Sequence, residues 1–227
     1  MGTVARLRAA GIGLGDEVIV PAYGNVGITE AVVSVGGLPV FADIDPDTYC
    51  LDSEAVAAVM GPSSAAIVAV RRFGGSAGLR QVEEAGSRMG LLVLQEADED
   101  GGADPADDVR RRAHAAYLSA RLRGVRTPLD SAGHTYERYV VRVPGNGRPD
   151  RDAFARAVRA KGVRCSVPVK TPVHRLPGYR RDITLPATER AAEETLALHI
   201  GGHLGRRDLQ RIVSACNALG GLLVPAS

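Results

Sequence analysis

The chain has 227 residues, a hydrophobic content of 45%, a charged content of 24% and a formal net charge of +2. That length allows one large domain or two small ones with apolar cores. The balanced charge argues against a nucleic-acid partner, because such binding needs a basic face and the arginines here are interspersed with acids. Only Lys161 and Lys170 are lysines, so lysine-dependent chemistry has two candidates.

Cysteine usage and apolar runs narrow the class of protein further. Cys50, Cys165 and Cys216 are scattered and odd in number, which argues against a disulfide framework and against a structural zinc site. The N-terminal residues contain no apolar signal region, and no apolar run approaches the roughly 20 residues that a membrane helix requires. We therefore expect a cytoplasmic protein with no membrane partner.

The first hundred residues alternate short apolar runs with helical patterns. The predicted strands are 17–21, 38–44, 65–70 and 91–95, and the predicted helices between them are 26–35, 54–60 and 79–89. Strands that are apolar throughout are buried on both faces, and their alternation with helices indicates a parallel sheet. We expect an α/β fold for this part of the chain.

The pattern changes after an acidic stretch rich in small residues, DEDGGADPADD at 98–108, which is typical of a linker. Beyond it we predict helices at 105–123, 151–161, 187–198 and 206–219, and strands at 136–143 and 163–169. The expected organisation is a reduced three-layer domain with a parallel sheet in residues 1–103 and a small α+β domain in residues 104–227.

Five sequence motifs follow one another in an order that resembles the DegT/DnrJ-type sugar aminotransferases. They are GIGLGDEVIVPAY at 11–23, GGLPVFADIDPDTYCLD at 36–52, LLVLQEA at 91–97, HTYERYVVRV at 134–143 and PVHRLPGY at 172–179. The family consists of fold type I enzymes that use pyridoxal phosphate (PLP). The resemblance implies an aminotransferase-like three-layer domain and, because family members are homodimers, a dimeric assembly.

The departures from the family pattern concern the cofactor. The aspartate that pairs with the pyridine nitrogen corresponds to Glu96, the glutamine that contacts the ring substituent to Glu99, and the stacking aromatic to Asn25. The resemblance also implies that the segment carrying the Schiff-base lysine is missing after residue 97, and neither lysine of this chain takes its place. PLP chemistry needs an amine, a carboxylate and a phosphate cradle, so we expect no cofactor.

Candidate site residues gather at the ends of the predicted strands, where open parallel sheets bind ligands. We expect Tyr23, Asn25, Arg71 and Arg72 to bind substrate, with Glu96 or Glu99 as a general base. The alternative is a structural arginine–acid network that closes the rim.

The histidines leave further alternatives. His174, in the motif at 172–179, is the third catalytic candidate, and its alternative is a turn histidine bonded to the backbone. His199 and His203 flank two glycines and do not share one helix face as zinc ligands would, so no metal site is expected.

Three functions remain open. The first is a PLP-independent, repurposed enzyme of natural-product or sugar biosynthesis that performs acid–base chemistry, such as dehydration, cyclisation or isomerisation, on a carbonyl-containing or sugar-like small molecule. The second is a non-catalytic subunit that forms a heterodimer with a full-length aminotransferase. The third is a decayed remnant or binding module.

Overall fold

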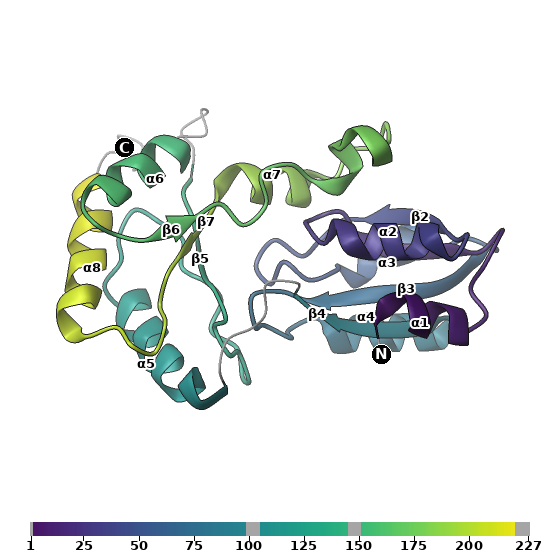
Figure 1. Cartoon of the computed structure of the whole chain (residues 1–227), viewed down its shortest axis with the longest axis horizontal. Helices are drawn as coiled ribbons and strands as arrows, with labels where there is room; N and C mark the ends of the chain where they lie inside the picture. Colours follow the sequence, from purple (N-terminus) through teal and green to yellow (C-terminus); the bar gives the residue numbers. More distant parts are fainter. Residues whose placement is uncertain (1, 99–104, 145–150, 221–227) are drawn as a thin grey trace. The chain divides into compact units, whose positions relative to one another are not determined.

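A computed structural model describes residues 2–98, 105–144 and 151–220, which form two compact units (Figure 1). The first unit comprises Met1–Arg72, Ser76–Glu99 and Thr171–Glu189, and the second comprises Phe73–Gly75, Asp100–Lys170 and Arg190–Ser227. This division differs from the predicted one at residue 103, mainly because Thr171–Glu189 joins the first unit.

Specific contacts hold Thr171–Glu189 in the first unit. The backbone N–H of Val173 donates to the carbonyl of Ala22 at 2.8 Å. The carboxylate of Asp43 accepts hydrogen bonds from the backbone N–H groups of Ala187 and Thr188 at 2.9 and 2.8 Å. A carboxylate that accepts bonds from a helix start stabilises that helix, so Asp43 anchors the beginning of α7 (Pro186–Glu194).

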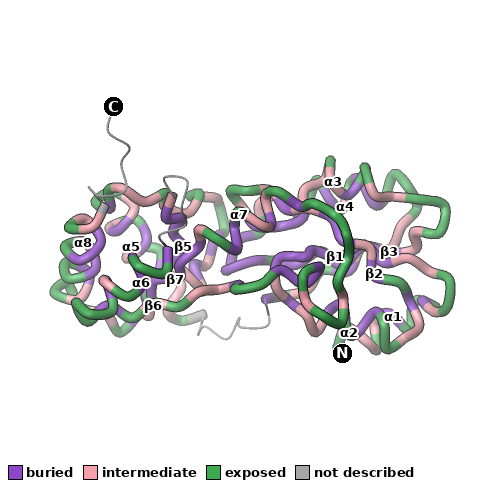
Figure 2. The backbone as a smooth tube through the Cα atoms, turned by 90° about the horizontal axis from the view of Figure 1, so that it is seen from above, coloured by how far each residue is buried: buried purple, intermediate pink, exposed green. Residues whose placement is uncertain are grey.

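The first unit is built on a four-stranded parallel sheet, as predicted. Its strands are β1 (Glu17–Pro21), β2 (Leu38–Ala42), β3 (Ser64–Arg71) and β4 (Leu92–Ala97), in the spatial order β2-β1-β3-β4. β1 and β3 are central, and most of their residues are buried, as the purple tube in Figure 2 shows. The parallel sheet therefore forms the buried middle layer of the unit.

Helices cover both faces of this sheet. Because successive strand residues point to opposite faces, Val18 and Val20 pack with α1 (Thr3–Ala9) and α2 (Val26–Ser34), whereas Ile19 packs with α3 (Ser53–Val59) and α4 (Leu79–Arg88). Asp52 caps α3 by accepting a hydrogen bond from the Glu54 N–H at 3.0 Å. The unit thus has three layers.

The second unit packs helices against an antiparallel sheet. Its strands, in the order β5-β7-β6, are β5 (Tyr139–Arg142), β7 (Thr195–Leu198) and β6 (Cys165–Ser166). One apolar core joins the sheet to α5 (Asp108–Ser119), α6 (Arg151–Ala160) and α8 (Arg206–Gly220). Three short 3₁₀ helices complete the described elements: Pro105–Asp107, Val173–Arg175 and Pro177–Tyr179. No helix in the described ranges has the length and apolarity needed to cross a membrane.

Three element predictions in the second half were wrong. The helix predicted at 187–198 ends at Glu194, and Thr195–Leu198 forms the central strand β7, whose Leu196 and Leu198 enter the core. The strand predicted at 163–169 is reduced to Cys165–Ser166, and Pro168, which has no N–H for the ladder, lies just beyond it. The strand predicted at 136–143 starts at Tyr139, because Tyr136 has a left-handed backbone with φ 48°.

Candidate functional site at the strand ends

The site is built where β1 and β3 of the first unit end. β1 runs into a turn in which Gly24 and Asn25 both have left-handed backbones, with φ 77° and 57°. Asparagine tolerates this conformation better than most residues that carry a side chain beyond Cβ. The turn reverses the chain into α2 and brings Asn25 beside Arg72, which directly follows β3.

A buried arginine–acid pair forms the centre of the site. Nη1 of Arg72 donates to Oδ1 of Asp98 at 2.7 Å and to Oδ1 of Asn25 at 2.9 Å. Only 4% of each charged side chain is exposed. Desolvating two charges is expensive, and good geometry with further hydrogen bonds is needed to offset it. Asn25 supplies one such bond to Arg72.

Aromatic rings flank the arginine. The guanidinium carbon of Arg72 lies 5.2 Å from the ring centroid of Tyr23, within the range of a cation–π interaction. The ring of Tyr23 stacks on that of Tyr49 at 5.7 Å between centroids. Both tyrosines are buried, so the structure brings predicted site residues Tyr23, Asn25 and Arg72 into one cluster.

The side-chain amide of Asn25 has hydrogen-bonding capacity that the described residues do not use. The amide nitrogen Nδ2 of Asn25 is buried and forms no hydrogen bond within the described residues. Buried donors are almost always paired, and leaving one unpaired costs about 1–3 kcal/mol. A bound oxygen atom could accept this bond.

Glu96 lies at the end of β4 on the face that α1 covers. Its Oε1 accepts a hydrogen bond from Nη1 of Arg6 at 2.9 Å, and 21% of the carboxylate side chain remains exposed. The same Arg6 nitrogen donates to the backbone carbonyl of Gln95 at 2.7 Å. Glu96 is therefore a partly accessible carboxylate held by a positive charge.

The remaining predicted residues lie apart from the cluster. Arg71, the last residue of β3, is exposed, whereas Arg72, which follows the strand, is buried. The substrate-binding role expected of Arg71 stays a prediction. Glu99 lies outside the described residues.

His174 is fully buried in the 3₁₀ helix Val173–Arg175. Its Nε2 lies 3.1 Å from Oε1 of Glu189, and its Nδ1 is buried without a partner in the described part of the chain. The hydrogen bonds from Arg175 and then from His174 lower the pKa of the Glu189 carboxyl. The contact with Glu189 fixes His174 in the first unit.

Sequence reasoning missed Arg6, Tyr49 and Glu189. Arg6 meets Glu96 across 90 residues of chain, and His174 meets Glu189 across 15. No local sequence motif predicts either contact, because both contacts form only when α1 and Thr171–Glu189 pack on the sheet. The pattern of charges along the sequence therefore could not have predicted that Arg6 pairs with Glu96 or that Glu189 pairs with His174.

The residues at these strand ends do not fit PLP. Glu96, which corresponds to the family's ring-nitrogen partner, already pairs with the Arg6 cation. Asn25, which corresponds to the stacking aromatic, offers an amide in place of a ring face and is bonded to Arg72. Lys161 and Lys170, the chain's lysines, both belong to the second unit and are exposed. No group of three or more metal-binding side chains occurs in the described ranges.

Comparison with curated proteins relates this chain to aminocyclitol aminotransferases. The L-glutamine:2-deoxy-scyllo-inosose aminotransferase of Streptomyces kanamyceticus is 43% identical over 98 residues, which are 43% of this chain and 23% of that protein. A putative L-glutamine:3-amino-2,3-dideoxy-scyllo-inosose aminotransferase of Streptoalloteichus tenebrarius is 33% identical over 141 residues, or 62% of this chain and 30% of that protein. The chain thus spans less than a third of the length of these relatives.

Solved structures and a family profile extend the likeness. DesV of S. venezuelae, solved with a ketimine intermediate, superposes with a TM-score of 0.85 at 22% identity, covering 96% of this chain and 82% of that one. The aminotransferase TlmJ of Streptoalloteichus hindustanus gives 0.85 at 23% identity, covering 98% and 84%. These structures share the fold. The profile of the DegT/DnrJ/EryC1/StrS aminotransferases matches residues 2–109 and 104–217, and the chain therefore belongs to that family, as its motifs predict.

Proposed function

We propose that this chain is a PLP-independent member of its family that binds a carbonyl-containing or sugar-like small molecule at the strand ends of the first unit. The observation that carries the proposal is the buried Arg72–Asp98 pair together with the amide nitrogen of Asn25, which has no hydrogen-bond partner among the described residues. The relatives are named for inososes, which are ring-shaped polyhydroxy ketones, and an aminotransferase of Pseudomonas aeruginosa is named for a 3-oxo-glucuronate. We extend that substrate class, and a role in natural-product or sugar biosynthesis, to this chain.

Each residue of the site has a part in this proposal. Nδ2 of Asn25 donates a hydrogen bond to an oxygen of the substrate, and the Arg72 cation fixes the amide so that this donor is oriented. Glu96, which is partly exposed and held by Arg6, accepts a proton from a carbon next to the carbonyl and returns it to another atom. Such proton transfers suit isomerisation, dehydration or cyclisation. Glu99 and His174 remain proposed alternatives for the proton-transfer role.

Two measurements test the proposal. Incubation with PLP followed by dialysis should leave no absorbance in the imine band, and a band that resists dialysis would refute cofactor independence. Calorimetric titration with scyllo-inosose should show saturable binding that Asn25→Ala weakens about tenfold, which corresponds to roughly 1.4 kcal/mol for one hydrogen bond. Asn217→Ala, an amide change in the second unit, serves as the control.

The catalytic part of the proposal has its own test. Glu96→Gln combined with Glu99→Gln should abolish turnover of the keto substrate while binding persists, since Asn25 and Arg72 are untouched. Turnover that survives in the double variant would remove the acid–base assignment. Retained binding with lost turnover separates the chemistry from folding.

A second candidate function is that of a non-catalytic partner subunit of a full-length aminotransferase. It is favoured by the position of β4, which lies at one edge of the sheet and pairs only with β3 among the described strands. An unpaired strand edge offers N–H and C=O groups to another chain. Co-expression with a full-length family member should yield a heterodimer on size-exclusion chromatography with light scattering. A stable homodimer that excludes the family member would contradict this candidate.

A further inference from the structure

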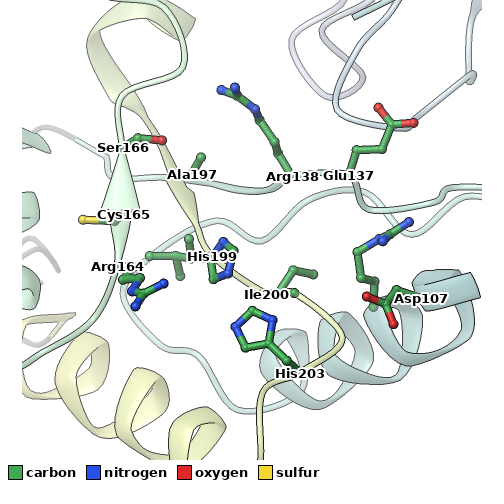
Figure 3. Close-up of a pocket in the computed structure, with 13 residues that line it drawn as sticks. Asp107, Glu137, Arg138, Arg164, Cys165, Ser166, Ala197, His199, Ile200 and His203 are labelled. Carbon is green, nitrogen blue, oxygen red and sulfur yellow. The ribbon is translucent and has the colours of Figure 1, made fainter. Parts of the chain in front are cut away.

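A pocket of about 480 Å³ opens in the second unit, far along the chain from the strand-end residues (Figure 3). Five basic side chains line it, and three of them, Arg164, His199 and His203, also line a neighbouring hollow of about 310 Å³. They come from the segment before β6 and from the loop after β7. Two hollows therefore share one cluster of basic groups.

The sheet register places Arg164 opposite His199. Cys165 of β6 pairs with Leu198 of β7, and the next pair is closed by a hydrogen bond from the His199 N–H to the Arg164 carbonyl at 3.1 Å. Leu198 enters the helical core, so the alternation of side chains turns His199 to the other face of the sheet. Two basic side chains thus lie directly opposite each other across the strands.

Gly201 allows the second histidine to join them. The ring centroids of His199 and His203 are 5.3 Å apart. A Cβ atom on Gly201 would lie 2.7 Å from Cε1 of His203 and 3.2 Å from Nε2 of His199. Any side chain at position 201 would therefore push the rings apart.

The cluster brings three basic side chains together, and none of them is paired with a carboxylate in the described part of the chain. Within the described residues, Arg164, His199 and His203 form no ion pair. Burial lowers the pKa of His199, and the positive neighbours His203 and Arg164 lower it further. Like charges placed opposite one another in a sheet are destabilising, so protonation of His199 beside Arg164 is unfavourable, and a bound anion would favour it.

The two hollows are also lined by six other charged side chains: Asp107, Arg111, Glu137, Arg138, Asp208 and Arg211. Asp208 is bonded to the Gly205 N–H and lies 3.5 Å from Arg211, and Arg111 pairs with Asp108. Burial raises the pKa of the Cys165 thiol, which keeps it neutral. The Asp107 carboxylate lies against the backbone of Gly202, and Glu137 accepts a hydrogen bond from Thr135. The part of the pocket that Arg164 and the two rings line is its cationic face.

We propose that Arg164, His199 and His203 bind a doubly charged oxyanion, namely the phosphoryl group of a small phosphorylated molecule. The planar guanidinium presents paired donors that match a phosphate, and each protonated imidazole presents two N–H donors. The site lies within the second unit alone and does not depend on the function proposed for the first. Two imidazoles without a third metal-binding side chain in the described residues favour an anion over a metal ion.

The test is a titration of the full chain with inorganic sulfate, followed by the NMR signals of the histidine Cε1 protons. Sulfate keeps both charges between about pH 6 and pH 8, so any change in affinity reports the protein. The His199 and His203 signals, assigned with His199→Gln and His203→Gln, should shift saturably. Binding should be about tenfold tighter near pH 6, where the rings are more protonated, and inorganic phosphate should compete.

Three variants make the test specific. Arg164→Gln should weaken sulfate binding about tenfold, the loss of one charge-assisted hydrogen bond. Gly201→Ala should weaken it several-fold without changing the charge, whereas Arg156→Gln, an exposed change on α6 outside the pocket, should leave it unchanged. Equal weakening by both arginine variants would overturn the site. Ring shifts with Zn²⁺ but none with sulfate would assign the histidines to a metal, and a failure of phosphate to compete would remove the phosphoryl class.

Discussion

Removal of the Asp98 carboxylate should destabilise the first unit strongly. Asp98→Ala leaves the Arg72 guanidinium buried beside Tyr23 without its 2.7 Å ion-pair contact. Breaking a buried pair from one side costs about 3–5 kcal/mol. At about 2–4 °C per kcal/mol for a chain of this length, the melting temperature of the first unit should fall by roughly 6–20 °C.

A matched control separates burial from charge. Arg80 and Glu84 on α4 form an ion pair of 3.3 Å with 83% and 52% of their side chains exposed, and exposed pairs contribute less than about 1 kcal/mol. Urea unfolding followed by far-UV circular dichroism should therefore show a small loss for Glu84→Ala and a large one for Asp98→Ala. The double variant Arg72→Met with Asp98→Leu should recover most of the loss, since no unpaired charge stays buried. Equal losses for the two single variants would refute the reasoning.

Three further predictions concern stability. Asp43→Ala should cost about 0.5–2 kcal/mol and speed hydrogen exchange at the Ala187 and Thr188 amides, whose bonds it removes; unchanged exchange would contradict this. Burial, with a smaller effect of a nearby arginine, lowers the pKa of His134 to about 4. The ring of the unfolded chain binds a proton below about pH 6.5. The free energy of unfolding should therefore fall as the pH drops from about 6.5 to 4. His134→Asn should flatten this dependence in denaturation series. Gly86→Ala should destabilise despite a better helix propensity, because its methyl would lie 2.5 Å from a β4 side chain, and a raised melting temperature would count against that packing.

The first unit could be predicted because its signals are local and repeat. Each apolar run is short, is bounded by a turn and is followed by a helical pattern. This alternation of strands and helices indicates a parallel sheet. The alternation of Val18 and Val20 against Ile19 then distributes side chains between two cores. Asp52 supplies the cap of α3.

In the second unit the sequence-based predictions were wrong where pairing between distant strands overrides the local secondary-structure preference. Residues 187–198 read as one helix because no glycine or proline interrupts them. Yet Thr195–Leu198 pairs with Tyr139–Arg142 on one side and Cys165–Ser166 on the other. Leu196 and Leu198 gain burial in the core as strand residues, and tertiary packing of this kind routinely overrides propensity.

The sequence predicted that candidate residues gather at the strand ends, but it did not predict which residues bond to one another there. Tyr23, Asn25 and Arg72 meet because parallel strands end at the same edge of the sheet. Arg71 is exposed and Arg72 is buried, a difference that the sequence RR alone does not show. The pairing of Glu96 with Arg6 depends on how α1 packs on the sheet, which no local pattern encodes.

The charges at the strand ends bear on the proposal that this chain works without PLP. Glu96 and Asp98 at the end of β4 are both neutralised by arginines, Arg6 and Arg72. A pyridinium placed against Glu96 would compete with the Arg6 guanidinium already bonded to it, and two cations at one carboxylate repel each other. A cofactor ring would also have to lie over Asn25, whose amide is bonded to Arg72. The rim is therefore organised around arginine–acid contacts, which supports the proposal of a site that does not use PLP.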